Sequence, residues 1–233
     1  MKIIKHKPRN LFKHLNYDLG YADLEALTRE DVGRRYYTPS GESFPSITTV
    51  LSAKPNPGLE KWRERVGEAE AAKISYRAST RGTAVHSIIE QYLDNKFSYA
   101  KEFTPDILAT FLQVQSILDI RVGTIYAQEC ALWSEYLGIA GRVDCVAEFD
   151  GVLSIIDFKT SKREKPESWC ESYFQQEAAY AIMWEERTGL PIEQLVTIIA
   201  VDEGNPQVFI QTRDDWTTPL MESIQYYKSV KNI

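Results

Sequence analysis

The chain has 233 residues, 43% of them hydrophobic, and a formal net charge of −6 at pH 7. This size and apolar content suffice for one sizeable core, and the acidic balance excludes a protein that coats nucleic acid through its overall charge. The apolar runs are far too short to span a bilayer and the N-terminus is basic, which favours a soluble intracellular protein over a membrane or secreted one. The three cysteines lack a C-x-x-C spacing and are expected to be core thiols.

Residues 1–55 are expected to form an N-terminal arm. Residues 1–40 lack clear periodicity, and one short helix is predicted at residues 21–27. A second helix is predicted to begin near Ser46, a residue type that caps helix N-termini, and to stop before the Pro-rich stretch 54–58. The basic residues before the first acidic residue predict either a solvated tail or an arm that contacts nucleic acid. They are Lys2, Lys5, Lys7, Arg9 and Lys13.

Residues 56–233 show helical and strand periods in turn, which predicts an α/β fold with a central mixed sheet flanked by helices. The clearest helix, 81–93, carries apolar residues at the spacing of a core-facing face. Asp150-Gly151 predicts a tight hairpin between two strands. The predicted helices cover 59–74, 81–93, 105–120, 169–187 and 214–229, and the predicted strands cover 123–137, 142–149, 152–160, 195–201 and 207–211.

Two charged residues, Asp157 and Lys159, interrupt an otherwise apolar strand. Because side chains alternate along a strand, both leave on the same face, and burial would require them to be paired, metal-bound or at the open end of the strand. The partner strand of the hairpin carries Asp144 within an apolar run. An acid-x-base triplet alone is also explained by an ion pair on an edge strand. Together with Asp144, it suits a divalent-metal site for phosphodiester hydrolysis.

Four short motifs occur in a fixed order around this hairpin. They are G-x-x-x-H at Gly82–His86, G-x-x-D at Gly141–Asp144, D-x-K-T-S at Asp157–Ser161 and Q-x-x-x-Y at Gln176–Tyr180. The ordered set resembles the RecB-like branch of the PD-(D/E)XK nuclease superfamily over roughly residues 44–210. The segment Phe44–Leu51 further resembles the one that precedes the nuclease core in mitochondrial genome maintenance exonucleases and related phage exonucleases. The resemblance implies a restriction-endonuclease-like core with a helical N-terminal arm or arch.

The resemblance implies a Mg²⁺- or Mn²⁺-dependent DNA exonuclease acting on single-stranded ends, in the cytoplasm, or the host-cell cytoplasm if a phage encodes it. A structure-specific endonuclease and a non-catalytic nucleic-acid-binding module on the same fold remain open alternatives. Some relatives carry a four-cysteine iron–sulfur cluster, which three cysteines do not support. DNA is the expected partner, no membrane is expected, and replication or recombination partners stay unspecified. Aromatic residues of the arm such as Tyr36 would either stack on unpaired bases or pack the arm onto the core.

The resemblance also implies roles for individual residues. His86, Asp144, Asp157 and the Phe158 carbonyl would bind the metal, and Lys159 would hold the attacking water, with the two aspartates as further catalytic residues. Glu129 would be a metal-facing catalytic acid or a polar residue at a strand end. A structural histidine, a helix cap at Ser46 and polar residues on a helix flank are the competing explanations for several of these positions. The expected substrate-binding residues are Ser46, Thr48, Arg81, Thr160, Ser161, Tyr173, Gln176 and Tyr180.

Overall fold

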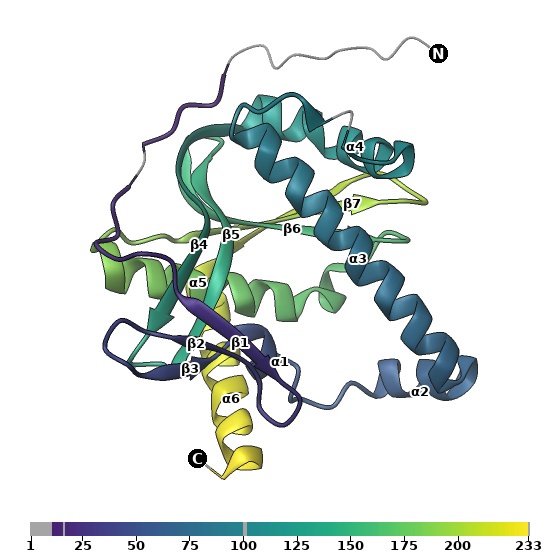
Figure 1. The fold of residues 1–233 in the computed structure, drawn as a ribbon, viewed down its shortest axis with the longest axis vertical. Helices are drawn as coiled ribbons and strands as arrows, with labels where there is room; N and C mark the ends of the chain where they lie inside the picture. Colours follow the sequence, from purple (N-terminus) through teal and green to yellow (C-terminus); the bar gives the residue numbers. More distant parts are fainter. Residues whose placement is uncertain (1–10, 16, 100–101, 233) are drawn as a thin grey trace.

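A five-stranded mixed sheet forms the centre of the protein in the computed structural model, which describes residues 11–15, 17–99 and 102–232. The strand order is β4-β5-β6-β7-β8; β6 and β7 run parallel and the other neighbours are antiparallel. The strands are β4 (Val122–Ser134), β5 (Ile139–Phe149), β6 (Val152–Ser161), β7 (Gln194–Val201) and β8 (Gln207–Thr212). The expected α/β architecture is therefore confirmed (Figure 1).

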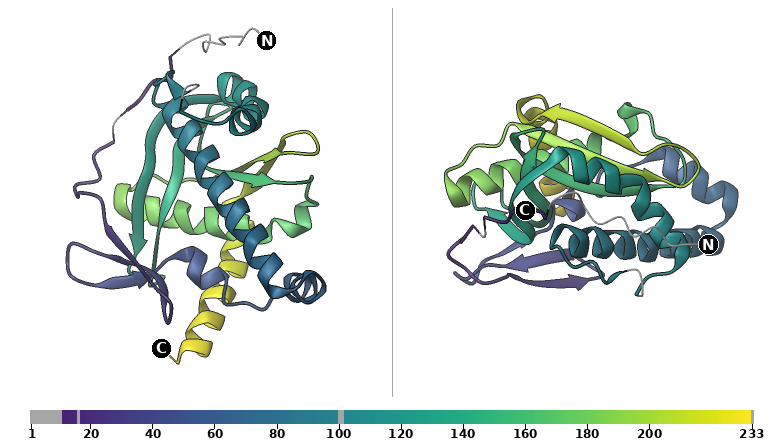
Figure 2. Two further views of the ribbon diagram at one scale, coloured as in Figure 1. Left: turned by 45° about the vertical axis from the view of Figure 1, so that its right-hand side comes forward. Right: turned by 90° about the horizontal axis from the view of Figure 1, so that it is seen from above.

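Helices cover both faces of this sheet (Figures 1 and 2). On one face, α3 and α4 share an apolar cluster with Ile156 and Phe158 of β6. On the other face, α5 and α6 share a second cluster with Ile155 of the same strand. Because alternate residues of β6 enter different clusters, the strand is buried on both sides, as its apolar sequence predicts. The helices are α3 (Glu68–Leu93), α4 (Pro105–Arg121), α5 (Glu171–Thr188) and α6 (Arg213–Lys231).

The hairpin between β5 and β6 has the predicted two-residue loop. Asp150 and Gly151 both have positive φ, 53° and 80°, and Phe149 pairs with Val152. Such loops need left-handed backbone at both positions, which Asp-Gly supplies at low cost. The loop fixes the register that pairs Cys145 with Ile156. Asp144 of β5 and Asp157 of β6 are the next residues beyond this pair.

The N-terminal region contains a second, three-stranded antiparallel sheet, β1 (Glu25–Arg29), β2 (Gly33–Tyr37) and β3 (Ser43–Pro45). The helix predicted at residues 21–27 is wrong, because pairing of β1 with β2 overrides the helical preference of its Ala and Leu. The turn into β2 ends at Gly33, whose φ is 73°. The basic residues Lys2, Lys5, Lys7 and Arg9 lie outside the described residues.

Short helices link this sheet to the core. Ser46 caps α1 (Ile47–Leu51) by accepting a hydrogen bond from the Thr49 N–H at 3.1 Å, as predicted. The single helix predicted over 59–74 is instead two helices, α2 (Pro57–Val66) and α3, which meet at Gly67. Gly67 has a φ of 82°, so the chain changes direction there instead of continuing one helix. The expected boundary near residue 55 falls between α1 and α2.

Residues 13–15 and 17–24 run along the outer edge of β4, the first strand of the large sheet. Ile125 N–H donates to the Lys13 carbonyl and Leu15 N–H donates to the Ile125 carbonyl, both at 2.8 Å. Further along, the Tyr21 hydroxyl donates to the Ala131 carbonyl at 2.6 Å. These bonds use backbone groups that an uncovered edge strand would leave unpaired. Among the described helices, none is both long and apolar enough to cross a membrane.

Candidate active site

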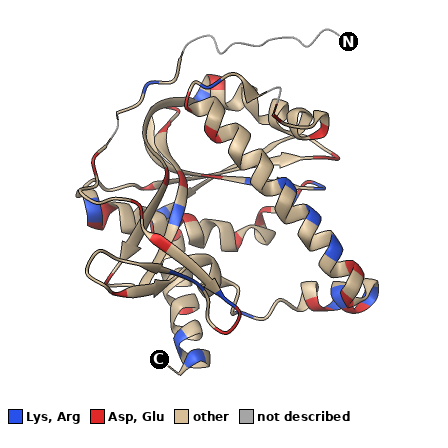
Figure 3. Ribbon diagram, in the orientation of Figure 1, with Lys and Arg blue, Asp and Glu red and all other residues tan. Residues whose placement is uncertain are grey.

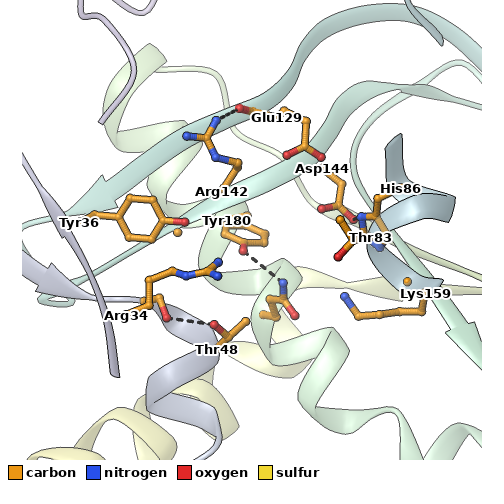
Figure 4. Close-up of a pocket in the computed structure, with 14 residues that line it drawn as sticks. Arg34, Tyr36, Thr48, Thr83, His86, Glu129, Arg142, Asp144, Lys159 and Tyr180 are labelled. Carbon is orange, nitrogen blue, oxygen red and sulfur yellow. Dashed lines mark hydrogen bonds and ion pairs between the residues drawn. The ribbon is translucent and has the colours of Figure 1, made fainter. Parts of the chain in front are cut away.

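A cavity of about 470 Å³ opens between the N-terminal sheet, α3 and the centre of the large sheet (Figure 4). Its lining comes from β2, α1, α3, β4, β5, β6 and α5. Segments far apart in the sequence therefore meet in one place. Eight predicted site residues line it: Ser46, Thr48, His86, Glu129, Asp144, Lys159, Gln176 and Tyr180.

Three acidic residues form a row across adjacent strands, and two of them, Glu129 and Asp144, line the cavity. Glu129 of β4 lies between residues that pair with Cys145 and Val143, so it is opposite Asp144 of β5. The β5–β6 ladder ends at Cys145 and Ile156, so Asp144 and Asp157 are the next residues beyond its last pair. Each carboxylate belongs to a different strand, so the sheet itself holds them together.

His86 of α3 completes a possible metal site above this row. Ligand atoms of His86, Glu129 and Asp144 all lie within 4.8 Å of one another, and His86 Nδ1 is 3.4 Å from Asp144 Oδ2. The same Asp144 oxygen, Oδ2, also accepts a hydrogen bond from the Phe158 N–H at 2.8 Å. One imidazole nitrogen with several carboxylate oxygens suits a hard divalent cation such as Mg²⁺ or Mn²⁺.

Asp157 and Lys159 form an ion pair directly beside the proposed metal ligands. The Asp157 side chain is 1% exposed and that of Lys159 is 20% exposed. Apart from this ion pair, neither Asp157 oxygen has a hydrogen-bond partner within the described part of the chain. A buried carboxylate with so few donors is costly without a cation, so its surroundings fit a site that also takes a metal ion.

Burial and mutual repulsion shift the acids of the row in different directions. Burial raises the pKa of Glu129 to about 7, and the charge of Asp144 adds to this rise. Burial likewise raises the pKa of Asp157 to about 6, although Lys159 opposes it. Burial would also raise the pKa of Asp144, but His86 and Lys159 outweigh it and the pKa is lowered. Asp144 thus ionises at a lower pH than Glu129 and Asp157, the spread of pKa values that interacting carboxylates in one site produce.

His86 and Lys159 respond to the same acids. Burial lowers the pKa of His86, but the hydrogen bond and charge of Asp144 more than reverse this and raise it overall. Burial also lowers the pKa of Lys159, and the charges of Asp157 and Asp144 more than compensate, so it is raised. The Lys159 ammonium is therefore held in its charged form next to the cavity.

The Q-x-x-x-Y motif lies on α5 beneath the cavity. Gln176 Nε2 donates to the Tyr180 hydroxyl at 3.1 Å, and both side chains are almost completely buried. A Cβ atom at Gly141 would lie 2.7 Å from the Tyr180 ring, so the G-x-x-D motif needs glycine for close packing against this helix. These contacts position the motif residues relative to Asp144, the last residue of G-x-x-D.

Several other predicted residues lie outside the cavity lining. Arg81 pairs with Asp202 and bonds the Thr110 hydroxyl, and Tyr173 accepts a hydrogen bond from Lys165. Ser161 donates to the Arg163 carbonyl at 2.6 Å, which supports a loop-capping role. Thr160 Oγ1 lies 3.7 Å from where a Cβ of Gly82 would be, so the two motifs approach closely. The Phe158 ring faces away from the carboxylates and packs near the His86 ring.

Four residues near the cavity are absent from the predicted site: Arg34, Thr83, Arg142 and Glu177. Arg34 is visible in the sequence only as half of the basic pair Arg34-Arg35, and Arg142 only as an unspecified position of G-x-x-D. Glu177 is completely buried on α5 and accepts a hydrogen bond from Thr197, which pairs with Asp157 across β6 and β7. Burial, aided by the charge of Asp157, raises the pKa of Glu177 well above its ordinary value.

Three known proteins with sequences similar to this chain carry the same name, which includes the word exonuclease. The chain is 31% identical to mouse mitochondrial genome maintenance exonuclease 1 over 53% of its own length and 39% of the relative. For the human and Xenopus tropicalis proteins of that name, identity is 28% and 29% over 81% and 70% of the chain. The chain thus spans only 39–60% of the length of these relatives.

A solved structure of a candidate exonuclease from Eubacterium rectale aligns with a TM-score of 0.43 and 11% identity. The alignment covers 65% of this chain and 68% of the Eubacterium rectale chain. The family assignment rests instead on the sequence. The family described as the PD-(D/E)XK nuclease superfamily matches residues 60–223, which include His86, Glu129, Asp144, Asp157 and Lys159. The chain belongs to the PD-(D/E)XK nuclease superfamily.

Proposed function

We propose that the protein is a metal-dependent deoxyribonuclease that removes nucleotides from the ends of single-stranded DNA. The observation that carries this proposal is the convergence of His86, Glu129, Asp144 and Lys159 in one cavity of a nuclease-superfamily chain. The names of the relatives support an exonuclease. The proposal includes an N-terminal arm, residues 1–55, that lies over the nuclease core. It also includes a likeness to phage exonucleases and a location in the cytoplasm.

The side chains divide the chemistry between them. His86, Glu129, Asp144 and Asp157, with the Phe158 carbonyl, would hold Mg²⁺ or Mn²⁺, which supplies Lewis-acid chemistry and lowers the pKa of water when bound. Lys159, kept protonated by its acidic neighbours, donates a hydrogen bond that orients the attacking water and balances negative charge developing on the phosphate. The imidazole among the oxygens fits Mn²⁺ at least as well as Mg²⁺.

The opposite wall of the cavity suits the phosphates of the substrate strand. Arg34 is exposed there, and its guanidinium forms no ion pair or hydrogen bond with any residue that the structure describes. The Thr48 hydroxyl lies on the same side of the cavity, across from His86 and Lys159 (Figure 4). Further basic residues lie along the half of α3 nearer α2 (Figure 3). Arginine and hydroxyl groups are common donors to phosphate oxygens, so this wall would hold the strand.

A cleavage assay tests the proposal on end-labelled linear single strands beside a circular one, with Mg²⁺, Mn²⁺ or EDTA. We expect metal-dependent loss of the linear strands only, and the label released first gives the polarity. Cutting of the circle would make the protein an endonuclease instead. Binding of DNA without cleavage in either metal would support a binding module on the same fold.

Two variants connect the activity to this site. Lys159→Ala is expected to abolish cleavage and leave DNA binding largely intact, because Lys159 acts on the water and not on the metal. Asp157→Ala is expected to remove metal binding, measured by calorimetry, together with cleavage. Cleavage at the wild-type rate by either variant would show that another site hydrolyses the strand.

A further inference from the structure

Glu129 has an unusual backbone for a residue in the middle of a strand. Its φ is 46°, in the left-handed region, while its neighbours Gln128 and Cys130 pair regularly with β5. A residue with a Cβ is strained in that conformation and keeps it only where surrounding contacts hold it. The strain falls at the residue that supplies one of the three converging ligand atoms. Something must therefore hold the backbone of Glu129 in place.

Arg142 makes the contact that can do this. Its guanidinium donates to the Glu129 carbonyl through Nη1 and to both carboxylate oxygens of Asp23 through Nη2, at 2.6 Å each. Arg142 is paired with Ala131 on the neighbouring strand, so its side chain crosses diagonally to Glu129. Figure 4 shows Arg142 joined to Glu129 on the side of the residue away from His86.

The other end of this contact is fixed by the N-terminal segment. Asp23 lies between two anchored residues. The Tyr21 hydroxyl donates to the Ala131 carbonyl, and Leu24 is buried in a small apolar cluster with Trp133. Arg142 is thus fastened between a segment anchored on β4 and the carbonyl of Glu129. A planar guanidinium can serve both acceptors at once, which a lysine ammonium does less well.

We propose that Arg142 is a positioning residue, which holds the left-handed backbone of Glu129 so that its carboxylate joins His86 and Asp144 as a metal ligand. This inference rests on the proposed metal-dependent function and assigns Arg142 no contact with the metal or the substrate.

The direction of the effect separates this role from a simple charge effect. Arg142 is a cation near a cation site, so through its charge alone its removal would strengthen metal binding. If Arg142 positions Glu129, its removal weakens metal binding. Residues that orient metal ligands typically change affinity by about 10- to 100-fold.

The experiment measures Mn²⁺ affinity by isothermal titration calorimetry on the full chain, with melting curves to establish that each variant is folded. We expect Arg142→Ala to weaken binding by about tenfold and Arg142→Lys, which keeps one donor group, by less. Arg121→Ala is the matched control: Arg121 forms a similar two-pronged ion pair, with Asp150, at the far end of the sheet. It should leave the affinity unchanged.

A double-mutant cycle with Glu129→Ala completes the test. In that background Arg142→Ala should change the affinity by less than about twofold, because the ligand that it positions is gone. Equal losses in both backgrounds, unchanged affinity or tighter binding in Arg142→Ala would each overturn the positioning role. If the wild type binds neither Mn²⁺ nor Mg²⁺, the proposed metal dependence fails and this inference fails with it.

Discussion

The two walls of the cavity differ in how their charged residues are satisfied. On the sheet side, His86, Asp144, Asp157 and Lys159 are partly or fully buried and each contacts another member of the group. On the side of the N-terminal sheet, Arg34 is exposed and its guanidinium is unpaired within the described residues. One wall is preorganised by its own ion pairs, and the other has a free donor.

This difference separates chemistry from binding. In the proposed function the sheet side carries the catalytic groups, which must be held in place before the substrate arrives, and burial and ion pairs hold them there. A group that binds a flexible strand can remain solvated until phosphate replaces its water. Variants on the sheet side should therefore change the rate or the stability, and variants on the opposite wall should change the affinity for DNA.

The largest expected effect is on the rate. Lys159→Met removes the ammonium and keeps the length of the side chain, and should lower kcat by about 10²- to 10³-fold, the usual loss when one donor to developing negative charge is removed. Single-turnover cleavage with saturating enzyme measures this. Lys162→Met, a change at a 74% exposed lysine three residues away, is the control and should cleave normally. Equal losses in both variants would contradict the division between the walls.

The next effect is on stability and depends on pH. The pKa of Glu177 is raised by burial, so the folded chain binds a proton that the unfolded chain releases above its ordinary pKa of 4.5. Glu177 therefore costs stability as the pH rises, and Glu177→Gln should be more stable than the wild type at neutral pH. The gain should grow by up to about 1.4 kcal/mol per pH unit between 4.5 and the folded pKa.

Urea unfolding in EDTA at several pH values measures this gain. It should vanish below pH 4.5, where Glu177 is protonated in both states. Glu222→Gln, on the exposed side of α6, provides the control for removing one negative charge from the chain. A gain that is the same at all pH values would show that Glu177 does not hold a proton.

A smaller effect is expected on the opposite wall. Arg34→Ala should raise KM for single-stranded DNA by about tenfold with little change in kcat, because it removes one charge-assisted contact. The slope of log affinity against log salt should become shallower by about 0.7. Arg35→Ala is a closely matched control, since Arg35 bonds Ser43 instead of lining the cavity. A fall in kcat without a change in KM would place Arg34 with the catalytic groups.

The smallest effect concerns the strain at Glu129. At ordinary strand positions Gly is less stable than Ala by about 0.5–1 kcal/mol, but a left-handed residue reverses this order. Glu129→Gly should therefore be more stable than Glu129→Ala by about 1 kcal/mol. The same two substitutions at Gln128 should show the ordinary order. If Ala is the more stable residue at both positions, the backbone of Glu129 is not strained.

Much of the fold could be predicted because its signals are local. The Asp-Gly loop and the apolar strand after it appear in the structure near the predicted bounds. The periodic helix predicted at 81–93 ends where α3 ends, but α3 begins at Glu68. The two wrong helices also have local causes. Gly67 divides one of them, and the residues of β1 form a strand because a partner strand lies a short turn away. Propensity alone does not reveal such pairing.

The sequence by itself determined that Asp144, Asp157 and Lys159 lie together, because a two-residue hairpin and the period of a strand fix their register. The ordered motifs likewise indicated the superfamily. Only the tertiary structure decided that Glu129 meets His86 and Asp144, that Arg142 holds its carbonyl and that Arg34 faces them across a cavity. These residues lie on separate elements whose approach depends on edge pairing and on packing of the N-terminal sheet. No period along the chain encodes that approach.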